Sequence, residues 1–206
     1  GLPNGISGRT GGGLLETFEV DAQIWFNSRF IAQGSFMGSL FNYAPKDLST
    51  GSELPGTYHG SGSQFRIAGG YSLFTMKSVF DSIAWVHAGY KSTHYSLPAS
   101  SDYTGNADFG SFFIGIGGQV QLQDRFGAQL GIDLGLLRSI SQTNLSFGDP
   151  SASTDLCFNV AGTYRYTEQV QFRVLMKLNS QAMDFPGGES VSQKMFSVAP
   201  SIMYYF

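Results

Sequence analysis

Few residues of this chain have the types and spacing that catalysis requires, and the most suggestive group is Ser92, His94 and Ser96. A serine hydrolase or acyltransferase needs a nucleophile, a base within hydrogen-bond reach and a third group that orients the base. Asp102, a carboxylate in the polar stretch that follows, could supply that third group. No distinctive nucleophile motif surrounds these residues, and serine, threonine and aspartate are abundant in similar stretches. We therefore expect a non-catalytic protein.

Metal and phosphate chemistry have less support. The three histidines and the single cysteine, Cys157, show no spacing typical of metal ligands, so we expect no metal site and no cofactor. Gly115, Gly117 and Gly118 form GIGG within an alternating stretch, not between a strand and a helix, so they do not match a phosphate-binding loop. We expect glycine there to relieve crowding between neighbouring side chains.

The elements that would position these residues are β-strands. From Leu14 onward, apolar and polar residues alternate with period two in nine segments, as in strands with one oily face. The first segment places Phe18 and Val20 on one face and Glu19 and Asp21 on the other. This pattern predicts an all-β protein.

The connections between the segments alternate between short and long. Short turns are expected at residues 27–28, 76–81, 124–125 and 167–168, and the long loops have roughly a dozen to twenty residues. Such alternation is typical of an up-and-down barrel, in which the short turns gather at one end. We expect an antiparallel barrel domain over residues 14–206, preceded by an irregular segment, or part of a first strand, at residues 1–13.

The composition limits the class of protein. Charged residues make up 13% of the 206 residues and aromatic residues 15%, with 27 glycines, and no apolar run is long enough for a membrane-spanning helix. A formal net charge of −3 without a basic cluster argues against nucleic acid as a partner. Alternating strands could still cross a membrane, because the polar residues of each strand offset its apolar residues in the mean hydropathy.

The last segment, residues 194–206, reads KMFSVAPSIMYYF and ends on an aromatic residue. Aromatic residues also gather beside the short turns, as expected at the level of lipid headgroups. This pattern resembles the bacterial outer-membrane β-barrels over residues 14–206. The resemblance implies a transmembrane β-barrel with short periplasmic turns and long extracellular loops. It also implies that Ile202, Tyr204 and Phe206 form the C-terminal signal that the barrel-insertion machinery reads.

The strand count leaves one question open. Nine strands is an odd number, whereas single-chain bacterial barrels have an even number. The missing strand could lie upstream of the sequence, or within residues 1–13, or be hidden by a miscount near residues 75–82. We expect ten strands, the first of them irregular, with eight as the alternative.

Charged residues occur on the faces opposite the apolar ones, where they would point into the lumen. They are Glu19, Asp21, Arg66, Lys91, Asp133, Arg165, Arg173 and Lys177. One interpretation is a network of ion pairs that fills a narrow lumen, because buried charges must be paired. The other is a selective pore lined by these charges. We favour the filled lumen, since side chains nearly fill a barrel of eight to ten strands.

A soluble, lipocalin-like barrel or a β-sandwich is the rival fold. It would turn the oily face inward and present a charged face to water. Here the face opposite the oily one is rich in glycine, serine, glutamine and alanine, which suits a crowded lumen better. The membrane barrel is therefore the favoured fold.

Together these inferences predict an integral protein of the bacterial outer membrane with a structural or anchoring role in the cell envelope or in a larger envelope complex. The alternatives are a small pore or conduit for small or apolar solutes and, third, an outer-membrane lipid-modifying enzyme. The expected partners are outer-membrane lipid, the barrel-insertion machinery and other envelope proteins, with no nucleic acid.

Overall fold

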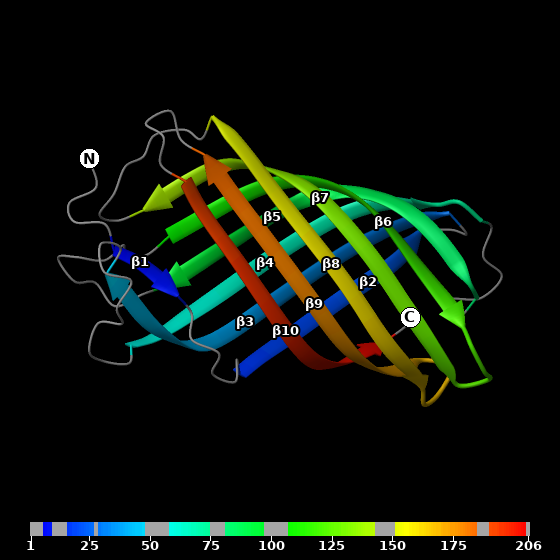
Figure 1. Ribbon diagram of the computed structural model, residues 1–206. Helices are drawn as coiled ribbons and strands as arrows, with labels where there is room; N and C mark the ends of the chain where they lie inside the picture. The colour runs from blue at the N-terminus through cyan, green and yellow to red at the C-terminus, as the bar shows by residue number, and fades with distance from the viewer. Residues whose placement is uncertain are drawn as a thin grey trace.

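The computed structural model describes residues 6–9, 16–26, 29–47, 58–74, 81–96, 107–142, 151–184 and 190–204. These ranges contain β-strands and no helix, and the strands wrap around one axis into a nearly closed barrel (Figure 1). The strands are β1 (Ile6–Arg9), β2 (Glu16–Phe26), β3 (Phe30–Asp47), β4 (Tyr58–Ser72), β5 (Ile83–Ser96), β6 (Ala107–Gln121), β7 (Phe126–Gln142), β8 (Ala152–Arg165), β9 (Val170–Asp184) and β10 (Ser190–Tyr204). The predicted all-β antiparallel fold class is confirmed.

Each strand from β2 to β10 pairs in antiparallel fashion with the next strand along the chain. Two of the predicted short turns are described, at residues 124–125 and 167–168. In the second, Thr167 Oγ1 accepts a hydrogen bond from the Val170 amide at 3.0 Å, which tightens the turn. The turn at residues 27–28, residues 75–80 and the longer connections at 48–57, 97–106, 143–150 and 185–189 lie outside the described residues. The strands extend into the segments predicted as long loops, so these connections are shorter than the predicted dozen to twenty residues.

Strands β1 and β2 lie end to end along the same edge of β3. β1 pairs with residues 44–47 of β3 and β2 with residues 30–40, and both run in the same direction. The barrel wall therefore has nine staves, if a stave is one strand position around the wall. The expectation of ten staves is not confirmed, because the short strand within residues 1–13 extends an existing stave.

An odd number of staves makes the closing seam, between β2 and β10, unlike every other contact in the wall. Eight antiparallel steps separate these two strands, so they run parallel to each other. They lie next to each other, but within the described residues no register pairs β2 with β10. The seam thus depends on contacts other than a regular backbone ladder.

The outer face of the wall is apolar and the inner face is polar. Large apolar side chains stand exposed on the outside, including Ile114 at 67% and Val20 at 65%, whereas Glu19, Lys91 and Asp133 are buried inside. The predicted assignment of the two faces is therefore confirmed. The rival arrangement, in which the oily face turns inward, is not observed.

Apolar groups occupy both ends of the lumen. Near the short turns, Ile31, Ile83 and Trp85 form a buried cluster, and the indole of Trp25 meets that of Trp85 edge to face at 6.5 Å between ring centroids. Near the long-loop end, the buried rings of Tyr95 and Phe109 pack at 5.8 Å. The charged residues lie between these two apolar layers.

Candidate functional site

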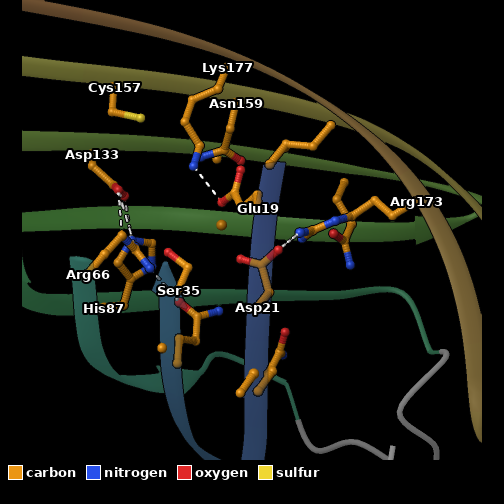
Figure 2. Close-up of a pocket in the computed structure, with 18 of the residues that line it drawn as sticks. Glu19, Asp21, Ser35, Arg66, His87, Asp133, Cys157, Asn159, Arg173 and Lys177 are labelled. Atoms are coloured by element: carbon orange, nitrogen blue, oxygen red, sulfur yellow. Dashed lines mark hydrogen bonds and ion pairs between the residues drawn. The ribbon is translucent and has the colours of Figure 1, made fainter. Parts of the chain in front are cut away.

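The charged side chains of the inner face surround a small cavity in the lumen, of about 100 Å³ (Figure 2). Seven of the eight charged residues predicted for the lumen line it: Glu19, Asp21, Arg66, Lys91, Asp133, Arg173 and Lys177. The eighth, Arg165, lies at the end of β8, where its guanidinium donates a hydrogen bond to the backbone carbonyl of Asp124 in the neighbouring turn. Arg165 therefore lies at the end of β8 and does not line the cavity.

The carboxylate of Asp133 on β7 contacts the side chains of Arg66 on β4 and His87 on β5. The guanidinium of Arg66 lies 3.2 Å from Asp133 Oδ2, and His87 Nε2 lies 2.6 Å from Asp133 Oδ1. The same guanidinium lies 4.5 Å from the centre of the Phe113 ring, as a cation–π contact. Figure 2 shows Arg66 and His87 converging on this carboxylate.

This contact exists because β6, the strand between β5 and β7, carries glycine at the crossing point. A Cβ atom on Gly115 would lie 2.4 Å from both Asp133 Oδ1 and His87 Nε2. Gly117 leaves room for Trp85 in the same way, because a Cβ atom on Gly117 would lie only 2.4 Å from the indole. The prediction that glycine relieves crowding is confirmed for these two residues, but not for Gly118, whose Cβ would meet nothing closer than 3.6 Å.

A second group joins β5 to β8 and β9. Lys91 Nζ donates a hydrogen bond to Asp155 Oδ1 at 2.7 Å and lies 3.4 Å from Asn179 Oδ1. All three side chains are buried. Asp155 is not among the charged residues predicted for the lumen, because it borders a polar stretch that is typical of a loop, whereas β8 already begins at Ala152. Asp155 lies on the same face as Cys157, so the period-two pattern did carry the signal.

A third group crosses the seam. Lys177 of β9 forms an ion pair with Glu19 of β2 at 2.6 Å, and Arg173 of β9 pairs with Asp21 of β2. Both cations pass over β10, the strand that lies between. Their passage is open because the inward residues of β10 are small and buried, namely Ser197, Ala199 and Ser201. Ser201 Oγ also accepts a hydrogen bond from Arg173 Nε at 2.9 Å.

Among the described residues, the charges that face the lumen balance. Four carboxylates pair with four cations, in the pairs Glu19–Lys177, Asp21–Arg173, Asp133–Arg66 and Asp155–Lys91. The attraction within a buried ion pair, together with additional hydrogen bonds, offsets the free-energy cost of removing the two charges from water. A single buried charge without a partner has no such offset. The net charge of these four pairs is zero, so together they give the lumen no overall preference for cations or anions.

Cys157 is buried on the inner face of β8. It lies beside the charged groups and lines the same cavity. In the described ranges, no group of three or more potential metal ligands comes together, and no helix is long and apolar enough to cross a membrane.

A separate pair of polar residues lies on the outside of the barrel. His94 Nδ1 is 2.6 Å from Asp108 Oδ1, and their side chains are 43% and 55% exposed. Ser92 and Ser96, predicted with His94, lie on the same face of β5, two residues to either side. Asp102 lies outside the described residues. Within the described residues, the carboxylate that contacts His94 is that of Asp108.

The sequence was also compared with known proteins. No family model matches the chain, and neither the curated proteins nor the solved structures contain a significant match. The fold and the contacts described above are therefore the basis for any assignment of function.

Proposed function

We propose that this protein is an integral β-barrel of the bacterial outer membrane that acts as a structural or anchoring component of the envelope or of a larger envelope complex. The observation that carries the proposal is the exposed apolar outer wall. A water-exposed surface so rich in Phe, Leu, Ile and Val would promote aggregation, whereas lipid is the matching solvent for it.

The height of this wall fits a bilayer. On the outside of β6 and the residue that follows it, the residues from Phe112 to Leu122 are apolar or glycine, and five of the six outward positions are large exposed apolar residues. Ten residue steps at about 3.3 Å each, tilted by about 40°, span roughly 25 Å across the membrane. That is the height of the apolar band in outer-membrane barrels, about 25 Å.

The filled lumen favours anchoring over transport. A cavity of about 100 Å³ holds a few water molecules, whereas sites for small organic ligands have volumes of about 300–1,000 Å³. The surrounding charges are paired with one another, and apolar groups lie at both ends of the lumen. In this proposal the lumen conducts no solute and carries out no reaction, so its paired charges serve to hold the wall together.

The orientation and route of assembly follow from the same proposal. The short turns at 124–125 and 167–168 face the periplasm and the long loops face outward. Ile202, Tyr204 and Phe206 act as the signal for the insertion machinery. Ile202 is 64% exposed on the outer face, in line with that role, while the side chain of Tyr204 and all of Phe206 lie outside the described residues.

Membrane insertion is tested by refolding the protein into phospholipid vesicles. We expect it to remain with the vesicles after an alkaline carbonate wash and to change its gel mobility when boiled, as a closed barrel does. A protein that stays monomeric and folded in buffer without detergent would contradict the proposal.

The choice between an anchor and a pore is tested in planar lipid bilayers. We expect the inserted protein to give no discrete conductance steps, because the lumen is filled and its charges are paired. Regular conductance steps would favour the pore instead. The anchoring role is tested by chemical crosslinking in native membranes, which should capture a defined envelope protein, and recovery of the barrel alone would contradict it.

A further inference from the structure

The exposed pair of His94 and Asp108 is part of a row that crosses three strands. In the registers of the wall, Ser63 of β4 lies directly opposite His94 of β5, which lies directly opposite Asp108 of β6. All three share the outer face, because they have the same parity as the exposed Phe65, Val86 and Phe112 of their own strands. The chain thus places a serine, a histidine and an aspartate side by side in that order.

The histidine in this row is oriented as a base. The Asp108 carboxylate accepts a hydrogen bond from His94 Nδ1 at 2.6 Å, and a neutral imidazole that donates from Nδ1 has its acceptor lone pair on Nε2. Asp108 lies on one side of β5 and Ser63 on the other. Because Nδ1 points toward β6, Nε2 lies on the side of the ring that is nearer to β4 and Ser63. Residues that face each other across strands have Cβ atoms about 5 Å apart, within reach of a serine hydroxyl.

The row lies at the long-loop end of the apolar wall, where apolar side chains give way to polar ones. An amphipathic substrate would lie at this boundary. Phe65 lies two residues from Ser63 toward the short turns and is 49% exposed. On the other side of Ser63, in the same row, is Gly38, and the exposed ring of Phe18 covers it: a Cβ on Gly38 would lie 2.3 Å from that ring. Ser63 therefore has aromatic surface on two sides and the polar pair of His94 and Asp108 on the third.

We propose that Ser63, His94 and Asp108 form a hydrolytic site for acyl esters of membrane lipids, with the acyl chain against Phe18 and Phe65. This inference rests on the membrane insertion proposed above and adds an outward-facing activity to a barrel whose lumen is inert. Ser63 and His94 are catalytic residues here, and Asp108 is a positioning residue that acts through His94.

The reaction proceeds in two balanced steps. Ser63 Oγ attacks the ester carbonyl carbon while its proton passes to His94 Nε2, and the carbon–oxygen bond to the lipid alcohol then breaks as His94 returns the proton to that alcohol. In the second step a water molecule attacks the acyl carbonyl carbon while its proton passes to His94 Nε2, and the bond from that carbon to Ser63 Oγ then breaks as His94 returns the proton to Ser63 Oγ. The products are a fatty acid and free Ser63.

The site is tested with two probes on protein whose heat-shifted gel mobility shows a folded barrel. A fluorophosphonate should label Ser63, identified by mass spectrometry of the labelled peptide, and the water-soluble ester p-nitrophenyl butyrate should be hydrolysed. Ser63→Ala should abolish both signals, and His94→Asn should lower hydrolysis by at least about 100-fold. Phospholipid vesicles then test whether lipid esters are substrates.

Matched variants separate this role from simple folding effects. Ser92→Ala and Ser96→Ala, on the same face of β5, should keep activity within about twofold. Asp108→Asn should lower kcat with KM unchanged, and Asp108→Glu should restore part of it. Absence of labelling and turnover in the folded parent, or full activity in Ser63→Ala, overturns the inference. Because the butyrate ester and the label need no membrane, they report on this site even where membrane insertion itself fails.

Discussion

Lys177 reaches over the strand next to it and forms a 2.6 Å ion pair with Glu19, so β9 is tied to β2 across β10. Arg173 and Asp21 repeat the arrangement four residues along β9. These pairs cross the only seam of the described wall that has no regular register. The seam is therefore closed from the inside, by side chains, where the rest of the wall is closed by backbone hydrogen bonds.

The first prediction concerns this ion pair. Lys177→Met should lower the free energy of unfolding by about 3–5 kcal/mol, because it leaves the buried Glu19 carboxylate without its cation. Glu19→Gln should cost a similar amount, whereas the double variant should be more stable than either single variant. Urea unfolding in vesicles, followed by tryptophan fluorescence, measures all three.

Arg165→Gln is the control for that series, because its guanidinium bonds a turn carbonyl on the exposed rim. Its unfolding free energy should stay within about 0.5 kcal/mol of the parent. Costs that simply add in the double variant would show that Lys177 and Glu19 do not interact.

The second prediction concerns the glycines of β6. Gly115→Ala should lower stability by about 1–3 kcal/mol, because the new methyl group would overlap His87 Nε2 and Asp133 Oδ1, each 2.4 Å away. Gly118→Ala, three residues along the same strand, should be neutral or slightly stabilising, since its Cβ would meet nothing closer than 3.6 Å. Equal effects of the two substitutions on the unfolding midpoint would contradict the packing described for the lumen.

The third prediction concerns the solvent of the outer wall. Ile116→Arg, near the middle of the apolar band, should cost about 2–4 kcal/mol in vesicles, whereas Leu122→Arg at the edge should cost about 0–1 kcal/mol. The two side chains are 58% and 66% exposed, so exposure does not distinguish them. A wall that faces water would accept both arginines at no cost, and unfolding titrations of the two variants would then coincide with the parent.

The fourth prediction uses Cys157 as a probe of the lumen. The thiol is only 6% exposed, so a large water-soluble maleimide should react with it far more slowly in the folded barrel than in the unfolded chain. Glu168→Cys in a Cys157→Ser background places the thiol on an exposed turn and should react at once. Gel shifts over time measure both rates, and rapid labelling of folded Cys157 would show that the lumen is open.

The two faces of the wall could be read from the sequence because strand pleating forces a period of two whatever a strand pairs with. The alternation at Phe18, Glu19 and Val20 thus sufficed to separate outside from inside. The ends of strands were harder, since the alternation fades where polar loops begin, and Asp155 was lost for that reason.

The partners within the lumen could not be predicted from the sequence. Lys91 and Asp155 are 64 residues apart and lie on strands three staves from each other, so their contact depends on the curvature of the closed wall. The row of Ser63, His94 and Asp108 depends on two strand registers, which the loop lengths alone do not determine. The sequence therefore indicates His94 as a candidate residue, but its contact with Asp108 follows only from the pairing of β5 with β6.

The parallel seam also has a consequence for how the barrel folds. From β2 to β10, every other contact in the wall joins strands that follow each other along the chain, so the wall can grow by adding one hairpin at a time. The seam alone joins distant segments, with Glu19 and Lys177 separated by 158 residues. Forming the seam has the largest entropic cost of loop closure, so we expect it to form last. The rate of seam closure would then limit the final step of folding, and variants of Glu19 or Lys177 would collect as nearly complete, unsealed barrels.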